Sequence, residues 1–296
     1  MFIENSTFIE YKPIMPKIIC PTSKPKNTFR KLLISGVSAF SFLLSGVALS
    51  GQVNLIHNGS FESTTVSNSA KVNNSNLSGW NIGTGTGGGY TFLTFSGQAG
   101  VNVGGGFPLW NVNNVIPNSS PDQGKFIVSD GAYHLTTLYQ TVTGLTVGKY
   151  YDLAFYQAAG QQKGFDGSTT EQWLVSFGGA LTTTNSILLP SGQTYTDTTQ
   201  VVTGGQNQYS HLMSNPNHGF VPWEQQHMTF RATAQSELIG FLALGGPLGQ
   251  PPFSLIDGIS LTEQVPEPGS VLLMLVGGVA FAFLRRRNLT KTVANV

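Results

Sequence analysis

The chain has 296 residues, and its composition excludes several classes of protein. Charged residues make up only 10% of it, while Gly is abundant at 36 residues and Ser, Thr, Asn and Gln recur throughout. Gly, Asn and Thr are poor helix formers, which argues against a long helical protein. Trp, Tyr and Phe are spread along the middle of the chain, unlike the composition of charged disordered proteins. We therefore expect a β-rich, loop-heavy extracellular domain.

The formal net charge of +1 conceals a segregation of charge along the chain. Between residues 51 and 265 there are five basic and eleven acidic side chains, a net charge of −6. The remaining basic residues lie near the two ends. An acidic domain without basic clusters lacks the electrostatic surface that nucleic acid requires, so nucleic acid is excluded as a partner.

The only cysteine is Cys20, which precedes the first apolar run. The segment 51–265 therefore contains neither a disulfide framework nor a cysteine-based zinc site. Its stability has to come from core packing, alone or together with a bound metal ion.

Residues 1–50 are predicted to be a secretory signal region. Arg30 and Lys31 precede an apolar run, and small residues at Ala48 and Ser50 fit a signal-peptidase site, so that cleavage leaves Gly51 at the mature N-terminus. Either Met1 or Met15 could be the initiator. The alternative is an uncleaved anchor or a buried helix.

The segment 51–263 shows short strand-like runs separated by turn residues. No helical periodicity intervenes, and pairs such as Asn58-Gly59 are strong turn signals. We predict an all-β domain, a jelly-roll β-sandwich. The expected strands cover 53–57, 90–95, 125–129, 134–142, 150–156, 172–177, 226–232, 238–244 and 253–261.

An apolar run from Val271 to Leu284 is followed at once by Arg285, Arg286 and Arg287. Fourteen residues of helix reach roughly 21 Å, less than the roughly 30 Å hydrocarbon core of a bilayer. We expect a short transmembrane helix with its arginines on the cytoplasmic side, so that the preceding domain lies outside.

The last part of the chain, 264–296, resembles the PEP-CTERM sorting signal of Gram-negative bacteria and cyanobacteria. The resemblance rests on Pro266-Glu267-Pro268, then the short apolar helix, then the arginine cluster 285–287, in that order. It implies that an exosortase, a membrane protease-transpeptidase, recognises the motif and removes or transfers the tail. The two prolines keep the motif extended, as entry into a protease groove requires. The alternative is a single-pass anchor with a proline-rich stalk.

Three other segments resemble carbohydrate-binding jelly rolls, the galactose-binding-like domains that include the DUF642 group. They are 54–62 followed by Gly79-Trp80, then 140–155, and finally 255–261. The segment from about 160 to 225 departs from the family pattern in its length. In such domains the first and last strands lie side by side, and a structural calcium ion often sits near them.

The resemblance places Glu62 and Asp257 at the acidic positions of that calcium site. Carboxylate and backbone carbonyl oxygens suit Ca²⁺, but two carboxylates fall short of its 6–8 oxygen ligands. The alternative is that Glu62 caps a loop and Asp257 hydrogen-bonds a turn. The histidines His211, His218 and His227 fit no metal-binding spacing and are interpreted as loop and strand residues.

Trp110 and Trp223 are the candidate sugar-binding residues, because both are expected outside clear strands. The apolar face of a sugar ring stacks on an aromatic side chain, while neighbouring polar groups bind its hydroxyls. The alternative is that both pack against the edge of the sandwich. Trp80 and Trp173 are expected in the core.

The sequence favours an exported, non-enzymatic protein of the cell envelope or extracellular matrix that binds polysaccharide. Two alternatives remain open at this stage. One is an extracellular carbohydrate-active enzyme, for which eleven acidic residues allow many catalytic pairs. The other is a structural matrix component without a small ligand.

Overall fold

A computed structural model describes residues 52–110, 119–265 and 277–278. Gly277 and Gly278 are helical, and a short 3₁₀ turn, η1, covers Thr86–Gly88. The strands are β1 (Ala70–Lys71), β2 (Asn81–Ile82), β3 (Thr91–Thr94), β4 (Phe126–Asp130), β5 (Thr137–Thr143), β6 (Tyr150–Gln161), β7 (Thr169–Phe177), β8 (Ala180–Thr184), β9 (Ile187–Leu188), β10 (Thr194–Tyr195), β11 (Thr199–Thr203), β12 (Gln206–Tyr209), β13 (Met213–Asn215), β14 (Phe220–Arg231), β15 (Ser236–Gly246) and β16 (Pro252–Glu263).

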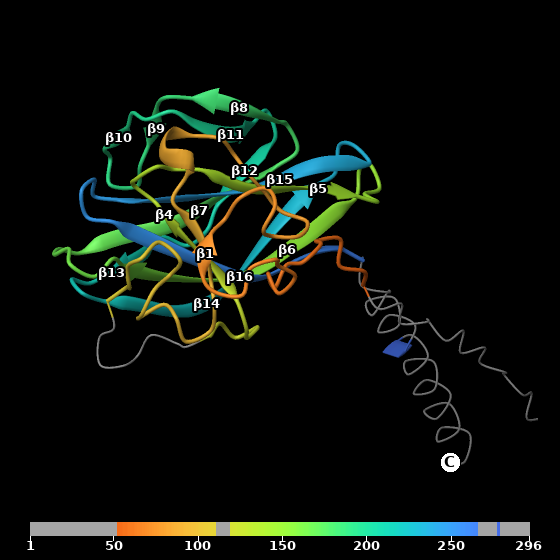
Figure 1. The fold of residues 1–296 in the computed structure, drawn as a ribbon. Helices are drawn as coiled ribbons and strands as arrows, with labels where there is room; N and C mark the ends of the chain where they lie inside the picture. The colour runs from red at the N-terminus through yellow and green to blue at the C-terminus, as the bar shows by residue number, and fades with distance from the viewer. Residues whose placement is uncertain (1–51, 111–118, 266–276, 279–296) are drawn as a thin grey trace, which may run out of the picture. The chain divides into compact units, whose positions relative to one another are not determined.

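Two antiparallel sheets form a sandwich (Figure 1). Sheet I has the strand order β1-β3-β4-β16-β6-β14. Sheet II has the order β12-β7-β15-β5-β2, with β13 also paired to β7. Neighbours in both sheets are mostly distant in sequence, as in the predicted jelly roll. The predicted fold class is confirmed.

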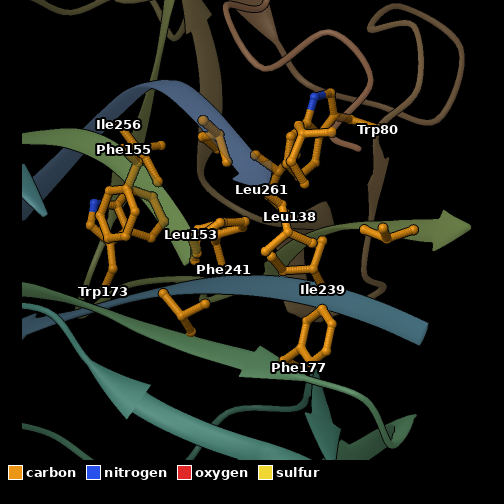
Figure 2. Packing of buried hydrophobic residues seen from close by; sticks show 14 of the residues in the cluster. Trp80, Leu138, Leu153, Phe155, Trp173, Phe177, Ile239, Phe241, Ile256 and Leu261 are labelled. Carbon is orange, nitrogen blue, oxygen red and sulfur yellow. The ribbon is translucent and has the colours of Figure 1, made fainter. Parts of the chain in front are cut away.

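The core lies between the sheets and is rich in aromatic side chains (Figure 2). Along β7, alternate residues from Thr169 to Phe177 face inward, because side chains alternate across a strand. Trp80 and Trp173 are buried as expected, and each indole N–H has a partner. Trp80 donates to the carbonyl of Asn58 over 2.9 Å, and Trp173 to that of Leu255 over 3.2 Å. Such bonds avoid the cost of burying an unpaired donor.

A third layer covers the outer face of sheet II. The hairpins β8–β11 and β9–β10 lie over β15 and β5 and appear at the top of Figure 1. Leu189 and Tyr195 of this layer pack with Leu242 and Leu244 of β15. Thr137 of β5 donates to a β11 carbonyl over 2.8 Å.

Loops cover the outer face of sheet I as well. Phe92, Phe126 and Phe253 point outward from β3, β4 and β16 and are buried beneath the segment 95–109. The outer faces are thus covered over β3, β4 and β16 and over β15, whereas Gln225, His227 and Thr229 on β14 stay exposed. Accessible surface is left on this part of β14 and on loops at the ends of the sandwich.

The segment 52–59 runs along β16, but it is not a strand, contrary to the expectation for 53–57. Leu55 donates to the carbonyl of Leu261 over 2.9 Å, and Ile259 donates to that of Gly59 over 3.1 Å. A Cβ at Gly59 would lie 1.9 Å from the Ile259 carbonyl oxygen, so only glycine permits this approach. The beginning and the end of the domain are side by side, as the resemblance implies.

Phe241 gives a test of this core. It is fully buried and its ring lies 5.8 Å from that of Phe155 and 5.9 Å from that of Trp80. We expect Phe241→Ala to lower the free energy of unfolding by about 3–5 kcal/mol in urea titration, because it leaves a cavity between the sheets. Tyr209→Ala is the control, since Tyr209 is 61% exposed, and its effect should be small.

Candidate functional site

Trp110 is fixed at the end of β6. Its backbone N–H donates to the carbonyl of Gln161 over 2.8 Å, and the N–H of Lys163 donates to that of Pro108 over 2.9 Å. The loop that carries Trp110 is thus joined to the end of the longest strand pairing in sheet I. A rigid strand end is a suitable support for a binding residue.

The Trp110 side chain is half-buried and held by neighbours. Its Nε1 donates to the carbonyl of Phe165 over 2.9 Å. The His218 ring lies 4.0 Å from the Trp110 ring, centre to centre, at an interplanar angle of 34°. The Lys163 Nζ lies 5.7 Å from the ring centre, within cation–π range. The ring is therefore positioned before any ligand arrives.

Polar groups surround this ring on two loops. His218 Nε2 lies 2.5 Å from Asp166 Oδ1, and Asn217 Oδ1 accepts from the N–H of Gly167 over 2.6 Å. The buried side chain of Gln161 holds both loops, since it donates to the Gly167 carbonyl and accepts from the His218 N–H. We call the following residues the Trp110 cluster: Trp110, Lys163, Asp166, Asn217 and His218.

A hollow of about 380 Å³ adjoins the Trp110 cluster along both loops. Its lining includes Ser168 and Pro216, the next residues after Gly167 and before Asn217. Asn215 also lines it, but its side chain is 1% exposed and hydrogen-bonds the Glu171 carboxyl. The hollow therefore presents exposed serine and proline side chains to a ligand.

Trp223 occupies a different environment. It lies within β14, not outside a strand as expected, at an irregularity in the pairing with β6 between Val221 and Glu224. Its ring meets that of Phe126 edge-on at 5.5 Å, and it packs on the apolar cluster outside sheet I. Its Nε1 is buried without a hydrogen-bond partner. This geometry matches edge packing, and the sugar-binding role of Trp223 stays a prediction.

Asp257 lies at a bulge of β16. The pairing of β16 with β6 shifts between Asp257 and Ser260, and Gly258 has a φ of 60°. The bulge turns Asp257 to the outer face, while Ile256 and Ile259 enter the core. The Ser120 hydroxyl donates to Asp257 Oδ2, but Oδ1 is buried without a partner. Burial, together with the nearby charges of Asp122 and Glu62, raises the pKa of Asp257 to about 8, although the Ser120 hydroxyl and the Gly258 N–H act in the opposite direction.

Glu62 approaches the same region but is already paired. Its Oε1 accepts from the backbone N–H of Lys125 over 2.5 Å, and its Oε2 lies 2.6 Å from the Lys125 Nζ. Within 52–110 and 119–265, no group of three or more His, Cys, Asp or Glu side chains is arranged to hold a metal ion. A calcium shell here would combine the free oxygen of Asp257 with backbone carbonyls, and Glu62 would join it on leaving Lys125. Asp257 and Glu62 do not by themselves supply the 6–8 oxygen ligands of Ca²⁺, so the calcium site stays a prediction.

Two buried carboxyl groups were not selected from the sequence. Burial raises the pKa of Asp130 to about 8, despite its bonds from the N–H groups of Ala132 and Tyr133. Burial likewise raises the pKa of Glu171 to about 8, and the charge of Asp130 adds to this. The Thr169 hydroxyl, 2.5 Å from Glu171 Oε1, acts in the opposite direction.

These two groups do not form an open catalytic cleft. Asp130 is 1% exposed and Glu171 0%, so a substrate does not reach either in this conformation. Glu171 hydrogen-bonds the side chain of Asn215, which lines the hollow. The sequence contained a signal for Glu171. Side chains alternate along a strand, so Glu171 lies on the same side of β7 as Trp173 and two further inward residues.

The three histidines of the later segment lie apart, each beside its own carboxylate. His211 Nδ1 is 2.9 Å from Glu224 Oε1, His227 Nδ1 is 3.2 Å from Asp152 Oδ2, and His218 belongs to the Trp110 cluster. Their interpretation as loop and strand residues agrees with their positions at 211, 218 and in β14.

The sorting residues Pro266, Glu267 and Pro268 and the cluster Arg285, Arg286 and Arg287 lie outside the described residues, as does the signal region 1–50. Within the described part of the chain, no helix is both long and apolar enough to span a membrane. The described domain ends with β16 at Glu263, followed by Gln264 and Val265.

Residues 264–287 match the PEP-CTERM protein-sorting motif. The chain carries a PEP-CTERM sorting signal. The match begins directly after β16 and includes both the Pro-Glu-Pro sequence and the three arginines. The signal implies that the protein is exported and that an exosortase processes it, after transient anchoring at the membrane.

Solved structures with a similar architecture include two carbohydrate-binding modules. One is TmCBM61, solved in complex with β-1,4-galactotriose. Its sequence is 10% identical to this chain, the TM-score is 0.37, and the match covers 72% of this chain and 100% of TmCBM61. The other is a CBM4 module that is 14% identical to this chain. The TM-score is 0.34, and the match covers 71% of this chain and 99% of the module. No curated protein matches the sequence. These likenesses concern the overall architecture and carry nothing about ligands.

Glu171 gives a test of the buried carboxyl groups. Its raised pKa means that its contribution to stability is fully present below pH 4.5 and is lost as the pH rises through about 8. The loss reaches on the order of 3 kcal/mol at pH 7. We expect Glu171→Gln to flatten the fall in unfolding free energy between pH 5 and pH 8, measured by urea titration. Asp166→Asn is the control, since Asp166 is 83% exposed; an equal flattening there would contradict the assignment.

Proposed function

We propose that the exported protein binds a neutral polysaccharide through the Trp110 cluster and the adjoining hollow. The observation that carries this proposal is the positioned Trp110 ring beside exposed polar side chains, those of Asp166 and Asn217, on two loops. Sugar-binding sites need such a combination, because a sugar ring has an apolar face and a polar rim.

The chemistry of the hollow favours hydroxyl groups. Beside it, Asp166 offers carboxylate oxygens that accept hydrogen bonds, and the exposed amide of Asn217 also offers a donor. A sugar hydroxyl both donates and accepts, so it can bond to either residue. The Trp110 ring lies on the loop next to this hollow, where a second sugar unit of the same chain would stack.

The charge of the domain favours a neutral polysaccharide. Residues 51–265 carry a net charge of −6, and Asp166 stands exposed in the Trp110 cluster. An anionic polymer would be repelled by this field. Lys163 is the one basic side chain of the cluster and does not reverse the balance.

We also propose that Asp257 binds a structural calcium ion, with Glu62 as a second carboxylate ligand. The support is the buried Oδ1 of Asp257, which has no partner, in the negative field of Glu62 and Asp122. A bound Ca²⁺ would compensate that field and join the loop at Ser120–Asp122 to β16. Its role is to stabilise the domain, which has no cysteine for a disulfide.

The sugar site is tested by Trp110→Ala in affinity electrophoresis against neutral and acidic polysaccharides. We expect binding to a neutral polysaccharide that weakens at least about tenfold in the variant, the loss typical of a central aromatic contact. Acidic polysaccharides such as alginate should bind less.

Trp223→Ala and Tyr209→Ala are the matched aromatic controls. Tyr209→Ala should leave binding unchanged, while Trp223→Ala should lower the melting temperature because Trp223 packs against Phe126. Binding that persists in Trp110→Ala and is lost only in Trp223→Ala would contradict the assignment to Trp110. Release of reducing sugar from the bound polysaccharide would indicate a carbohydrate-active enzyme instead.

The calcium site is tested by thermal unfolding with Ca²⁺ and with EDTA. We expect Ca²⁺ to raise the melting temperature of the unchanged protein, because it binds only the folded state. Asp257→Asn should abolish the response without lowering the melting temperature in EDTA, since the amide keeps the size of the side chain and an acceptor for Ser120. Asp152→Asn is the control and should respond as the unchanged protein does. An equal calcium response in Asp257→Asn would contradict the proposal.

A further inference from the structure

Exposed apolar side chains gather at the corner where the domain leads into its sorting tail. Eleven large apolar residues are exposed in the described part of the chain, and most stand singly, which is ordinary for a protein surface. Four of the eleven belong to this corner: Val53, Val147, Tyr150 and Val265. We call these four the exit corner.

The exit corner surrounds one hollow of about 480 Å³. Tyr150 and Val265 line it directly, and the lining residues Gln52 and Gly148 are the chain neighbours of Val53 and Val147. The β5–β6 turn, the start of the described chain and the end of β16 therefore meet here, which joins segments about 200 residues apart in sequence.

Hydrogen bonds fix this corner. Gln264 donates to the carbonyl of Tyr150 over 2.8 Å, and the Gln52 side chain donates to that of Glu263 over 2.9 Å. The N–H of Gly148 donates to the carbonyl of Ala232 over 2.8 Å, and the N–H of Ala232 donates to that of Lys149 over 2.9 Å. The turn that holds Val147 is fixed as well. The apolar side chains are thus presented outward by a rigid support, and little conformational entropy is lost when they are covered.

The length of chain after the corner limits what can cover it. Val265 is the last residue before the Pro-Glu-Pro motif, and the apolar run of the tail begins at Val271. Six residues reach at most about 20 Å even when fully extended. While the tail is held in a membrane, the exit corner lies within that distance of the lipid surface.

The charges of the corner are balanced in an otherwise acidic domain. Lys149 pairs with Glu263 over 3.4 Å, Asp152 lies 3.2 Å from His227, and Arg231 donates to the carbonyl of Gly148. Two of the five basic side chains of residues 51–265 are here, so the repulsion from anionic lipid is lowest on this side.

We propose that the exit corner is a docking surface for the phospholipid bilayer while the sorting tail is in place. Tyr150 suits the interface between headgroups and acyl chains, and the three valines enter its outer part. Because the membrane-held tail keeps the domain near the bilayer, the effective concentration of lipid at the exit corner is high. Four apolar side chains that would bind lipid weakly by themselves therefore suffice for contact. The docking holds the Pro-Glu-Pro segment close to the bilayer surface. The inference rests on the membrane-held sorting tail and is independent of the sugar site.

The experiment uses the full chain with Cys20→Ser, which removes the only cysteine. Val147→Cys carries an environment-sensitive fluorophore, and Leu188→Cys, in the β9–β10 hairpin and 70% exposed, is the matched control. Each protein is reconstituted into phosphatidylcholine vesicles that contain nitroxide-labelled lipid. We expect the label at 147 to shift to the blue and to lose most of its emission, while the label at 188 stays as in water.

Further measurements separate the possible outcomes. Flotation of the full chain with the vesicles reports insertion of the tail, and a chain that does not float would overturn both the membrane-held tail and the docking. A chain that floats while both labels are quenched equally would overturn the docking alone. Because the corner is neutral, quenching should be unchanged by added salt or phosphatidylglycerol, and Tyr150→Ser should reduce it. A quenching that salt abolishes would contradict the apolar mechanism.

Discussion

The antiparallel pairing of β16 with β4 and β6 is the interaction on which the rest of the structure depends. It places the last strand of the domain in the middle of sheet I, beside the first described segment. The bulge at Asp257 then lets Ile256 and Ile259 both enter the core, while the acid between them turns outward. One strand thereby supplies core residues, the candidate calcium ligand and the start of the sorting tail.

Layers outside the two sheets limit where a binding site can lie. Aromatic residues fill the space between the sheets, the β8–β11 layer covers β15 and β5, and the segment 95–109 covers β3, β4 and β16. Accessible polar side chains are left on β14 and on the loops at the end of β6. Gln161 lies at that boundary, since its buried amide holds the loops that carry Asp166 and His218.

The candidate site could be predicted only in part, because it is built from residues distant in sequence. Trp110 was recognisable as an aromatic residue in a loop, but its partners lie some 50 to 110 residues later and are joined to it only by the fold. The β8–β13 segment was not predicted, because its strands are short and polar and gain their order from packing on β7 and β15. Trp223 was placed outside a strand because Pro222 precedes it, and the pairing irregularity in β14 accommodates that proline.

The sequence by itself determined the all-β class, the segregation of charge, the core positions of Trp80 and Trp173 and the sorting signal at 264–287. The first three features follow from local composition and from the alternation of side chains along strands. The sorting signal is a linear motif that another protein recognises, so it needs no folded context. The tertiary structure alone decided that Asp257, Asp130 and Glu171 are buried, that His218 lies against Trp110, and that four exposed apolar side chains meet at the tail. The physical reason is that burial and juxtaposition depend on strand pairings between residues far apart in the chain, which no local pattern specifies.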